Sequence, residues 1–397
     1  MKDNSRNDKV LELLDAIRAN GLDNVSVLSE KVGIPVESAR YMIWHEFPKH
    51  FISFDVDVDI EGLGLGTWLI EFTPSGHGAQ SGIFGGGVGI TYTARVLPEN
   101  SYVAFVAAPF GNHYKLWIEL ERLVKDGSIL NYSLTEVKAM RNISLNPSFY
   151  SFTDRKWNFT WKEVEAHEKK IGEARAKRLP PLKSGRESKA LDVDYRDLLI
   201  LREFQKRIPK SISKLEKPLE IDQYNIRYHY NQHVRHAILG YRAKVIPEKP
   251  REISSFLFLL SQLDDDSLAQ ARCVALSLPF VDYEWKTEKD YGWHVSCPGE
   301  YSNELLRHLA QRLAEFNGEI RFLTLDSMSE FRGTIPVQSF DEKTQTWNYE
   351  PKISSSKPYA SFQELRNSCE YETEGRCLVN ELDPKKCVTS ICPFAVR

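Results

Sequence analysis

Apolar positions in the first fifty residues recur with a helical period. One such face consists of Val10, Leu13, Leu14 and Ile17. This spacing predicts a first helix over 7–19, and Gly21 is expected to end it because glycine readily adopts the left-handed conformation of a helix cap. A second short helix is expected after Ser26 as its N-cap. Beyond a turn at Gly33, Pro35 opens a third helix that ends near Glu46. Three short helices with a glycine turn are typical of a helix-turn-helix.

After residue 50 the apolar and polar positions alternate, as they do in β-strands. Residues 51–60 predict a half-exposed strand. A helix at 112–125 and further strands are expected after it, the strands at 67–73, 90–96, 102–108 and 128–137. If the Gly-rich stretch between the first two of these strands is a distorted helix, the order is β-α-β-β-α-β, which is a ferredoxin-like sandwich.

The same order occurs a second time, and more clearly. The predicted elements are strands at 254–261, 280–286, 292–297 and 319–325 and helices at 266–275 and 302–316. The helical segment repeats as well, at a constant offset: Leu198, Leu201 and Leu215 stand where Leu11, Leu14 and Leu28 stood. Each copy also ends in a Trp-Asn-aromatic sequence, at Trp157 and at Trp347. The duplication therefore covers nearly the whole chain.

These patterns predict an α+β protein in which two winged or helix-turn-helix domains alternate with two ferredoxin-like domains. The expected parts are a helix-turn-helix at 1–50, a ferredoxin-like domain at 51–165, a charged linker at 166–190, a diverged helix-turn-helix at 191–235, a second ferredoxin-like domain at 236–350 and a cysteine-rich tail at 351–397.

Composition is that of an ordinary soluble protein, with 42% hydrophobic and 27% charged residues. There is no apolar run long enough for a membrane span and no signal-peptide pattern at the N-terminus, so a cytoplasmic location is expected. The net charge of −3 argues against general coating of nucleic acid. Residues 169–251 are nevertheless basic, which indicates phosphate contact. A solvated helix face plus a charged linker is the alternative.

The domain order and one local segment resemble the Lrp/AsnC (feast/famine) family of transcription regulators. Residues 58–65, Val-Asp-Ile-Glu-Gly-Leu-Gly-Leu, are similar to the family's Asp-x-x-x-Leu-Gly-Leu entry into its effector domain. The second copy departs from the pattern, with Pro218 inside the helix-turn-helix and Glu220 where Gly33 makes the first turn. The resemblance implies a regulator of double-stranded DNA whose two effector domains pair internally as a pseudo-dimer. A small-molecule effector and a further homodimer remain open.

Polar residues on the two expected recognition helices are the candidate DNA contacts. They are Ser38, Arg40, Tyr41 and His45 in the first helix and Gln223, Asn225, Arg227, Tyr228 and Asn231 in the second. Arginine suits guanine, whereas Asn and Gln suit adenine. Further phosphate contacts are expected from Lys206, Arg207 and Lys210. For the aromatic residues, packing against the following domain is the alternative.

The C-terminal tail holds four of the six cysteines: Cys369, Cys377, Cys387 and Cys392. Four thiolates can complete a tetrahedral shell, so the tail is a candidate site for Zn²⁺ or for an iron–sulfur cluster. Disulfide pairing is the alternative. Cys273 and Cys297 lie in an apolar helix and strand and are expected to be buried in the core.

Catalytic motifs are sparse. The Gly-rich run from Ser75 to Gly89 lacks the lysine and the spacing of a phosphate-binding loop, so a flexible or tightly turned connection is the simpler interpretation. A helical face of His229, His233 and His236 is better explained as a basic surface than as a metal site, since no nearby cysteine or pair of acids completes a shell.

The leading expectation is therefore a DNA-binding transcription regulator that is not an enzyme. A protein-interaction adaptor on the same scaffold is one rival. A siroheme-decarboxylase-like enzyme is another, since those enzymes resemble the Lrp scaffold and use histidines and arginines of the ferredoxin-like domain for a tetrapyrrole. Residues 92–95, Tyr-Thr-Ala-Arg, lie on a comparable strand, but no matching histidine-rich pattern accompanies them.

Overall fold

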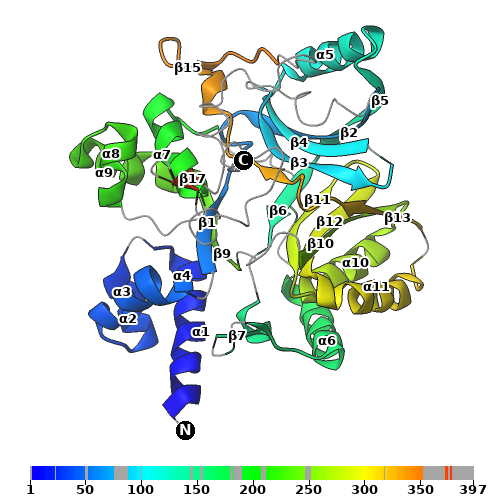
Figure 1. Cartoon of the computed structure of the whole chain (residues 1–397). Coiled ribbons are helices and arrows are strands. Elements are labelled where there is room, and N and C mark those ends of the chain that lie inside the picture. Colours follow the sequence, from blue (N-terminus) through cyan, green and yellow to red (C-terminus); the bar gives the residue numbers. More distant parts are fainter. Residues whose placement is uncertain are drawn as a thin grey trace.

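The computed structural model shows a mixed α+β protein built around one long antiparallel sheet (Figure 1). It describes residues 2–351, 372–373 and 376–377, apart from residues 23, 50–51, 76–87, 100, 144–145, 153, 155, 179–181, 183–189, 207–211, 246–251 and 317. Within these residues, no helix has the length and apolarity that crossing a membrane requires. The domain boundaries drawn from the sequence stay a prediction.

A first group of helices packs at the N-terminus. It comprises α1 (Lys2–Asn20), α2 (Val25–Val32), α3 (Val36–Tyr41), the π-helical turn η1 (Met42–Glu46) and α4 (Phe47–Lys49). Ala39, Ile43 and Phe47, on α3, η1 and α4, are fully buried. The N-cap of α2 is Asn24 rather than Ser26, because the Asn24 side chain accepts hydrogen bonds from the backbone N–H groups of Ser26 and Val27.

A second group repeats this arrangement. It comprises α7 (Tyr195–Gln205), η4 (Ile212–Lys214), α8 (Glu216–Leu219), α9 (Gln223–Gln232) and η5 (Val234–Ala237). The repeat positions Leu198, Leu201 and Leu215 are buried, as the sequence predicted. Glu220 adopts φ 54°, and Gly33 adopts φ 68° at the corresponding turn. The left-handed turn is therefore retained without glycine.

A two-stranded ribbon lies beside both helical groups. Strand β1 (Ile52–Val58) pairs antiparallel with β9 (Ile238–Val245). The expectation that β1 is half exposed is wrong, because Ser53 and Asp55 on its polar face are also buried. Asp55 lies 2.6 Å from Arg242 Nε on the partner strand, and this ion pair offsets the cost of burying its charge.

The long sheet consists of two units with the same strand order. The first unit has β2 (Leu65–Pro74), β3 (Ile90–Leu97), β4 (Ser101–Pro109), α5 (His113–Lys125) and β5 (Ile129–Val137). The second has β10 (Ile253–Ser261), α10 (Asp265–Ser277), β11 (Val281–Lys286), β12 (Asp290–Pro298), α11 (Gly299–Leu313) and β13 (Glu319–Leu325). Their orders, β5-β2-β4-β3 and β13-β10-β12-β11, are consistent with a ferredoxin-like α+β fold. The Gly-rich stretch read as a distorted helix lies largely outside the described residues.

Each unit lends a short strand to the other. Strand β6 (Ala139–Asn142) follows the first unit and pairs with β11, while β14 (Phe331–Arg332) follows the second and pairs with β3. Strand β13 also pairs with β3, so the sheet is continuous across both units. Apolar residues of the two units, including Phe105 and Trp285, meet in one core cluster. The two units therefore pair within a single chain.

Helices and short hairpins complete the structure. Helix α6 (Trp161–Arg178) lies against α10 in the second unit (Figure 1). Corresponding segments follow the units: η2 (Pro147–Phe149), β7 (Tyr150–Ser151) and β8 (Lys156–Trp157) after the first, and η7 (Val337–Ser339), β15 (Phe340–Asp341) and β16 (Thr346–Trp347) after the second. Strands β17 (Glu372–Thr373) and β18 (Arg376–Cys377) pair near the C-terminus. Cys273 and Cys297 are buried, as expected.

Candidate functional site

A cluster of polar side chains surrounds His294 where the two units meet. His294 lies on β12 and is fully buried. Its Nδ1 lies 3.0 Å from Asp282 Oδ2. Its Nε2 lies 2.9 Å from Ser255 Oγ and 3.1 Å from the hydroxyl of Tyr92, which comes from the first unit. Both ring nitrogens are thus engaged, and the two halves of the chain contribute to one polar centre.

Arg332 and Glu330 add charge to this cluster. Arg332 donates a hydrogen bond of 2.7 Å to Asp282 Oδ2, and its guanidinium lies over the ring of Tyr92. Glu330 lies 3.6 Å from both His294 Nε2 and Arg332. Burial acts to raise the pKa of Glu330, but its interactions with His294 and with Arg332 outweigh this effect and hold the pKa below its usual value. Glu330 therefore stays ionised next to the imidazole.

Two tyrosines, Tyr92 and Tyr283, contact the ring of His294. Burial raises the pKa values of Tyr92 and Tyr283 well above that of a free phenol. Both phenols are therefore neutral near pH 7 and can donate hydrogen bonds. The ring of Tyr283 stacks on that of His294 at a centroid distance of 4.8 Å. This stacking, together with Asp282, fixes the orientation of the imidazole.

A β-bulge brings Asp282 into this position. The register of β11 against β12 shifts between Val281 and Tyr283, so Asp282 is the extra residue. Bulges re-aim side chains and are frequent beside functional sites. The side chains of Asp282, Arg332 and Glu330 keep between 11% and 17% of their exposure, whereas that of His294 keeps none. A ligand would therefore meet the carboxylates and the guanidinium first.

The first unit has a corresponding position without the charges. The strand register places Phe105 opposite Tyr92 as it places His294 opposite Tyr283. The bulge recurs in β3, where Thr91 takes the place of Asp282. Asn142 pairs with Tyr283 as Arg332 pairs with Tyr92. The charged and ionisable residues His294, Asp282 and Arg332 therefore have the uncharged counterparts Phe105, Thr91 and Asn142. The internally repeated fold thus carries an asymmetric centre.

This cluster has the parts of an acid–base site. It combines an oriented imidazole, a neutral phenol and a guanidinium that can hold an anionic group. Sequence reasoning named Tyr92 through the enzyme rival but found no matching histidine-rich pattern, so it did not single out His294. The signal that could have found it is the hairpin 281–298, whose register brings Asp282 beside His294 across neighbouring strands.

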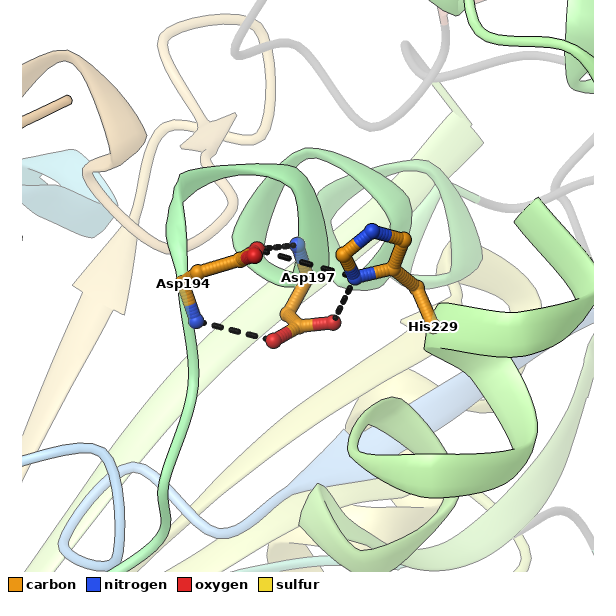
Figure 2. A group of neighbouring side chains, drawn as sticks. All are labelled: Asp194, Asp197 and His229. Carbon is orange, nitrogen blue, oxygen red and sulfur yellow. Dashed lines mark hydrogen bonds and ion pairs between the residues drawn. The ribbon is translucent and has the colours of Figure 1, made fainter. Parts of the chain in front are cut away.

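A second polar group joins the start of α7 to α9, and Figure 2 shows its three side chains converging. His229 Nδ1 lies 2.8 Å from Asp197 Oδ1 and 3.7 Å from Asp194 Oδ1. One potential metal-ligand atom from each of the three residues lies within 4.8 Å of the other two. This group is far from His294 in sequence and belongs to the second helical group.

The candidate DNA contacts that the structure describes lie on the two helical groups. Six are exposed, namely Arg40, Tyr41, His45, Arg227, Tyr228 and Asn231, and three are partly exposed, namely Ser38, Gln223 and Asn225. Lys206 is buried with Nζ 2.7 Å from Glu203 Oε1, so it is not on a surface that could reach phosphates. Arg207 and Lys210 lie outside the described residues. A contact of these residues with DNA stays a prediction.

Most of the cysteine tail lies outside the described residues. Cys369, Cys387 and Cys392 lie outside the described residues, and for Cys377 only its backbone in β18 is described. A zinc or iron–sulfur site in the tail stays a prediction.

No known protein family matches the chain, and no curated protein matches it by sequence. Among solved structures, it is similar to the siroheme decarboxylase NirDL in complex with an iron-uroporphyrin III analogue, with a TM-score of 0.46 and 13% identity over 80% of this chain and 90% of that one. A second structure of siroheme decarboxylase NirDL gives a TM-score of 0.45 and 12% identity over 94% and 98%. An anthrone oxidase-like protein gives 0.31 and 9% over 68% and 93%.

These comparisons correct the assignment to the Lrp/AsnC transcription regulators, which is wrong. Two of the three similar structures are of an enzyme, siroheme decarboxylase, and no DNA-binding regulator is among the three. They also give no support to the expectation that the chain is not an enzyme. The physical reason is general: one scaffold can carry unrelated sites, so the order of domains does not fix the function.

Proposed function

We propose that the chain is an enzyme that binds a carboxylate-bearing tetrapyrrole at the His294 centre and decarboxylates one of its side chains. The observation that carries this proposal is the buried imidazole of His294, held by Asp282 and in hydrogen-bonding distance of Tyr92. The solved siroheme decarboxylase, whose bound ligand is an iron-uroporphyrin analogue, suggests the class of substrate.

The cluster supplies groups for both binding and proton transfer. Arg332 is the natural partner for a substrate carboxylate, because a guanidinium binds carboxylates through paired N–H donors. It is already placed 2.7 Å from one carboxylate, that of Asp282.

The reaction balances with one proton and no redox partner. In a side chain R–CH₂–COO⁻ the bond to the carboxylate carbon breaks and CO₂ leaves. The electron pair left on the methylene carbon takes a proton from His294, which gives R–CH₃. Solvent then returns a proton to His294. Asp282 keeps the ring oriented throughout, which is the usual role of a carboxylate behind a catalytic histidine.

The test is turnover of iron-uroporphyrin III or siroheme by the full-length protein, followed by mass spectrometry for the loss of CO₂. The change in tetrapyrrole absorbance on addition of the protein measures binding in a separate experiment. His294→Gln is expected to lower kcat by about 10²-fold or more, because a general acid contributes on this order. Arg332→Gln is expected to weaken binding chiefly.

The matched control is His113→Gln, since His113 is exposed and stacks on Trp68 rather than joining the cluster. This variant should turn over like the wild type. The proposal is wrong if the wild type neither binds nor decarboxylates either tetrapyrrole, or if the His294 variant keeps full activity.

A further inference from the structure

The group of Asp194, Asp197 and His229 has the geometry of a cation site. The two carboxylates come from the start of α7, and the imidazole comes from α9 (Figure 2). His229 Nδ1 lies 2.8 Å and 3.7 Å from the two carboxylate oxygens. The separation expected between two ligand atoms of one ion lies between these two distances. Donor atoms about 2.1 Å from a zinc-sized ion lie roughly 3 to 3.5 Å apart.

Two carboxylates of this group lie close to a single imidazole. Asp197 is 2% exposed, whereas the side chain of Asp194 keeps 43% of its exposure. In the described part of the chain, neither Asp194 nor Asp197 has an ion pair with a lysine or arginine, and the partner of both is His229. Two carboxylates thus face one imidazole that carries at most a single charge. A buried carboxylate in this position favours an added positive ion.

Backbone hydrogen bonds hold both carboxylates in place. Asp194 accepts from the backbone N–H of Asp197, and Asp197 accepts from that of Asp194, which forms a capping box. Such bonds orient metal-binding carboxylates in known sites. The capping box engages Asp194 Oδ1 and Asp197 Oδ2, so Asp197 Oδ1 faces His229. The capping box does not involve His229, so it does not explain why a histidine lies beside the two carboxylates.

We propose that Asp194, Asp197 and His229 bind a divalent transition-metal ion, which takes the place of the proton between His229 Nδ1 and Asp197 Oδ1. Imidazole together with carboxylates suits ions such as Mn²⁺ or Zn²⁺. Three protein ligands leave room for water in the remaining positions. The ion would tie the start of α7 to α9 and stiffen the second helical group. Sequence reasoning rejected a metal site at these histidines because no nearby cysteine or pair of acids completes a shell, whereas the fold supplies two acids from 32 and 35 residues upstream of His229.

The test is a titration of the whole protein with Mn²⁺. Calorimetry measures the binding, and electron paramagnetic resonance detects the bound ion. Mn²⁺ is chosen because the thiolates of the cysteine tail prefer softer ions. The wild type should bind one equivalent that is lost with a chelator. His229→Gln and Asp194→Asn should each weaken this binding by about tenfold or more, since even supporting residues of a metal site contribute this much.

Asp194→Asn also separates the metal from the cap, because asparagine caps helices as well as aspartate does. The matched control is Asp264→Asn, the same change at the N-cap of α10, where Asp264 accepts from Ser267 N–H. It should bind Mn²⁺ like the wild type. The proposal fails if the wild type takes up no stoichiometric Mn²⁺, or if Asp194→Asn and His229→Gln both bind as the wild type does. Neither outcome bears on tetrapyrrole turnover at His294.

Discussion

At the scale of single residues, Glu284 shows how the fold accommodates a buried charge. Glu284 on β11 is fully buried and is held by Arg272, whose Nε and Nη2 lie 3.0 Å and 2.9 Å from its two oxygens. The hydroxyl of Tyr291 donates a third hydrogen bond of 2.8 Å. Arg141 of β6 lies 3.6 Å away, so the network also crosses between the two units. His294 is held in the same way, by hydrogen bonds to Asp282, Ser255 and Tyr92.

Replacement of Glu284 by glutamine should therefore destabilise the fold strongly. The change keeps the shape of the side chain but leaves the buried guanidinium of Arg272 without its counter-charge. Breaking a buried pair in this way costs about 3–5 kcal/mol. Urea unfolding would measure it, with Asp15→Asn as the control, because the Asp15–Arg18 pair is exposed and worth less than about 1 kcal/mol. A loss below that of the control would contradict the role assigned to Glu284.

At the scale of elements, the sequence predicted the helices and strands well and the sites poorly. Periodicity located α10, β12 and β13 because burial on one face leaves a local trace in the chain. His294 and Asp282 leave no such trace, since their contact depends on a bulge and on the register of a hairpin. The contact of His229 with Asp197 depends in addition on the packing of α9 against α7. Both sites depend on tertiary structure, whereas the helices and strands depend largely on local sequence.

The paired turns of the two helical groups give a prediction at this scale. Gly33 and Glu220 both adopt left-handed conformations, with φ of 68° and 54°. A Cβ at Gly33 would meet nothing within 4 Å, so the cost of Gly33→Ala is conformational alone. This variant should lose about 1 kcal/mol, while Glu220→Gly should gain up to about 1 kcal/mol, because a side chain in this region is strained. Thermal unfolding of the two variants should shift in opposite directions, and a shift of both in the same direction would contradict this view of the turns.

At the scale of the whole molecule, the two halves of the repeat depend on each other. Strands β6 and β14 cross over to the opposite unit, and β1 pairs with β9 across the halves. The shared core cluster buries Phe105 of the first unit and Trp285 of the second completely. His294 also needs Tyr92 from the other half. The first half has Phe105 at the position where the second half has His294. The single chain therefore holds one asymmetric centre, to which both halves contribute.

Because of this dependence, the halves 1–190 and 191–397 should not fold independently when made as separate chains. Each would expose the apolar face that the other covers, and a large exposed apolar patch favours aggregation. Produced together, they should form a soluble one-to-one complex, since the strand pairing of β3 with β13 and of β6 with β11 needs no covalent link. Size-exclusion chromatography and circular dichroism of each half and of the pair would measure this. A half that is monomeric and shows cooperative unfolding by itself would mean that the two units are independent domains, and that the centre at His294 forms by their docking rather than by common folding.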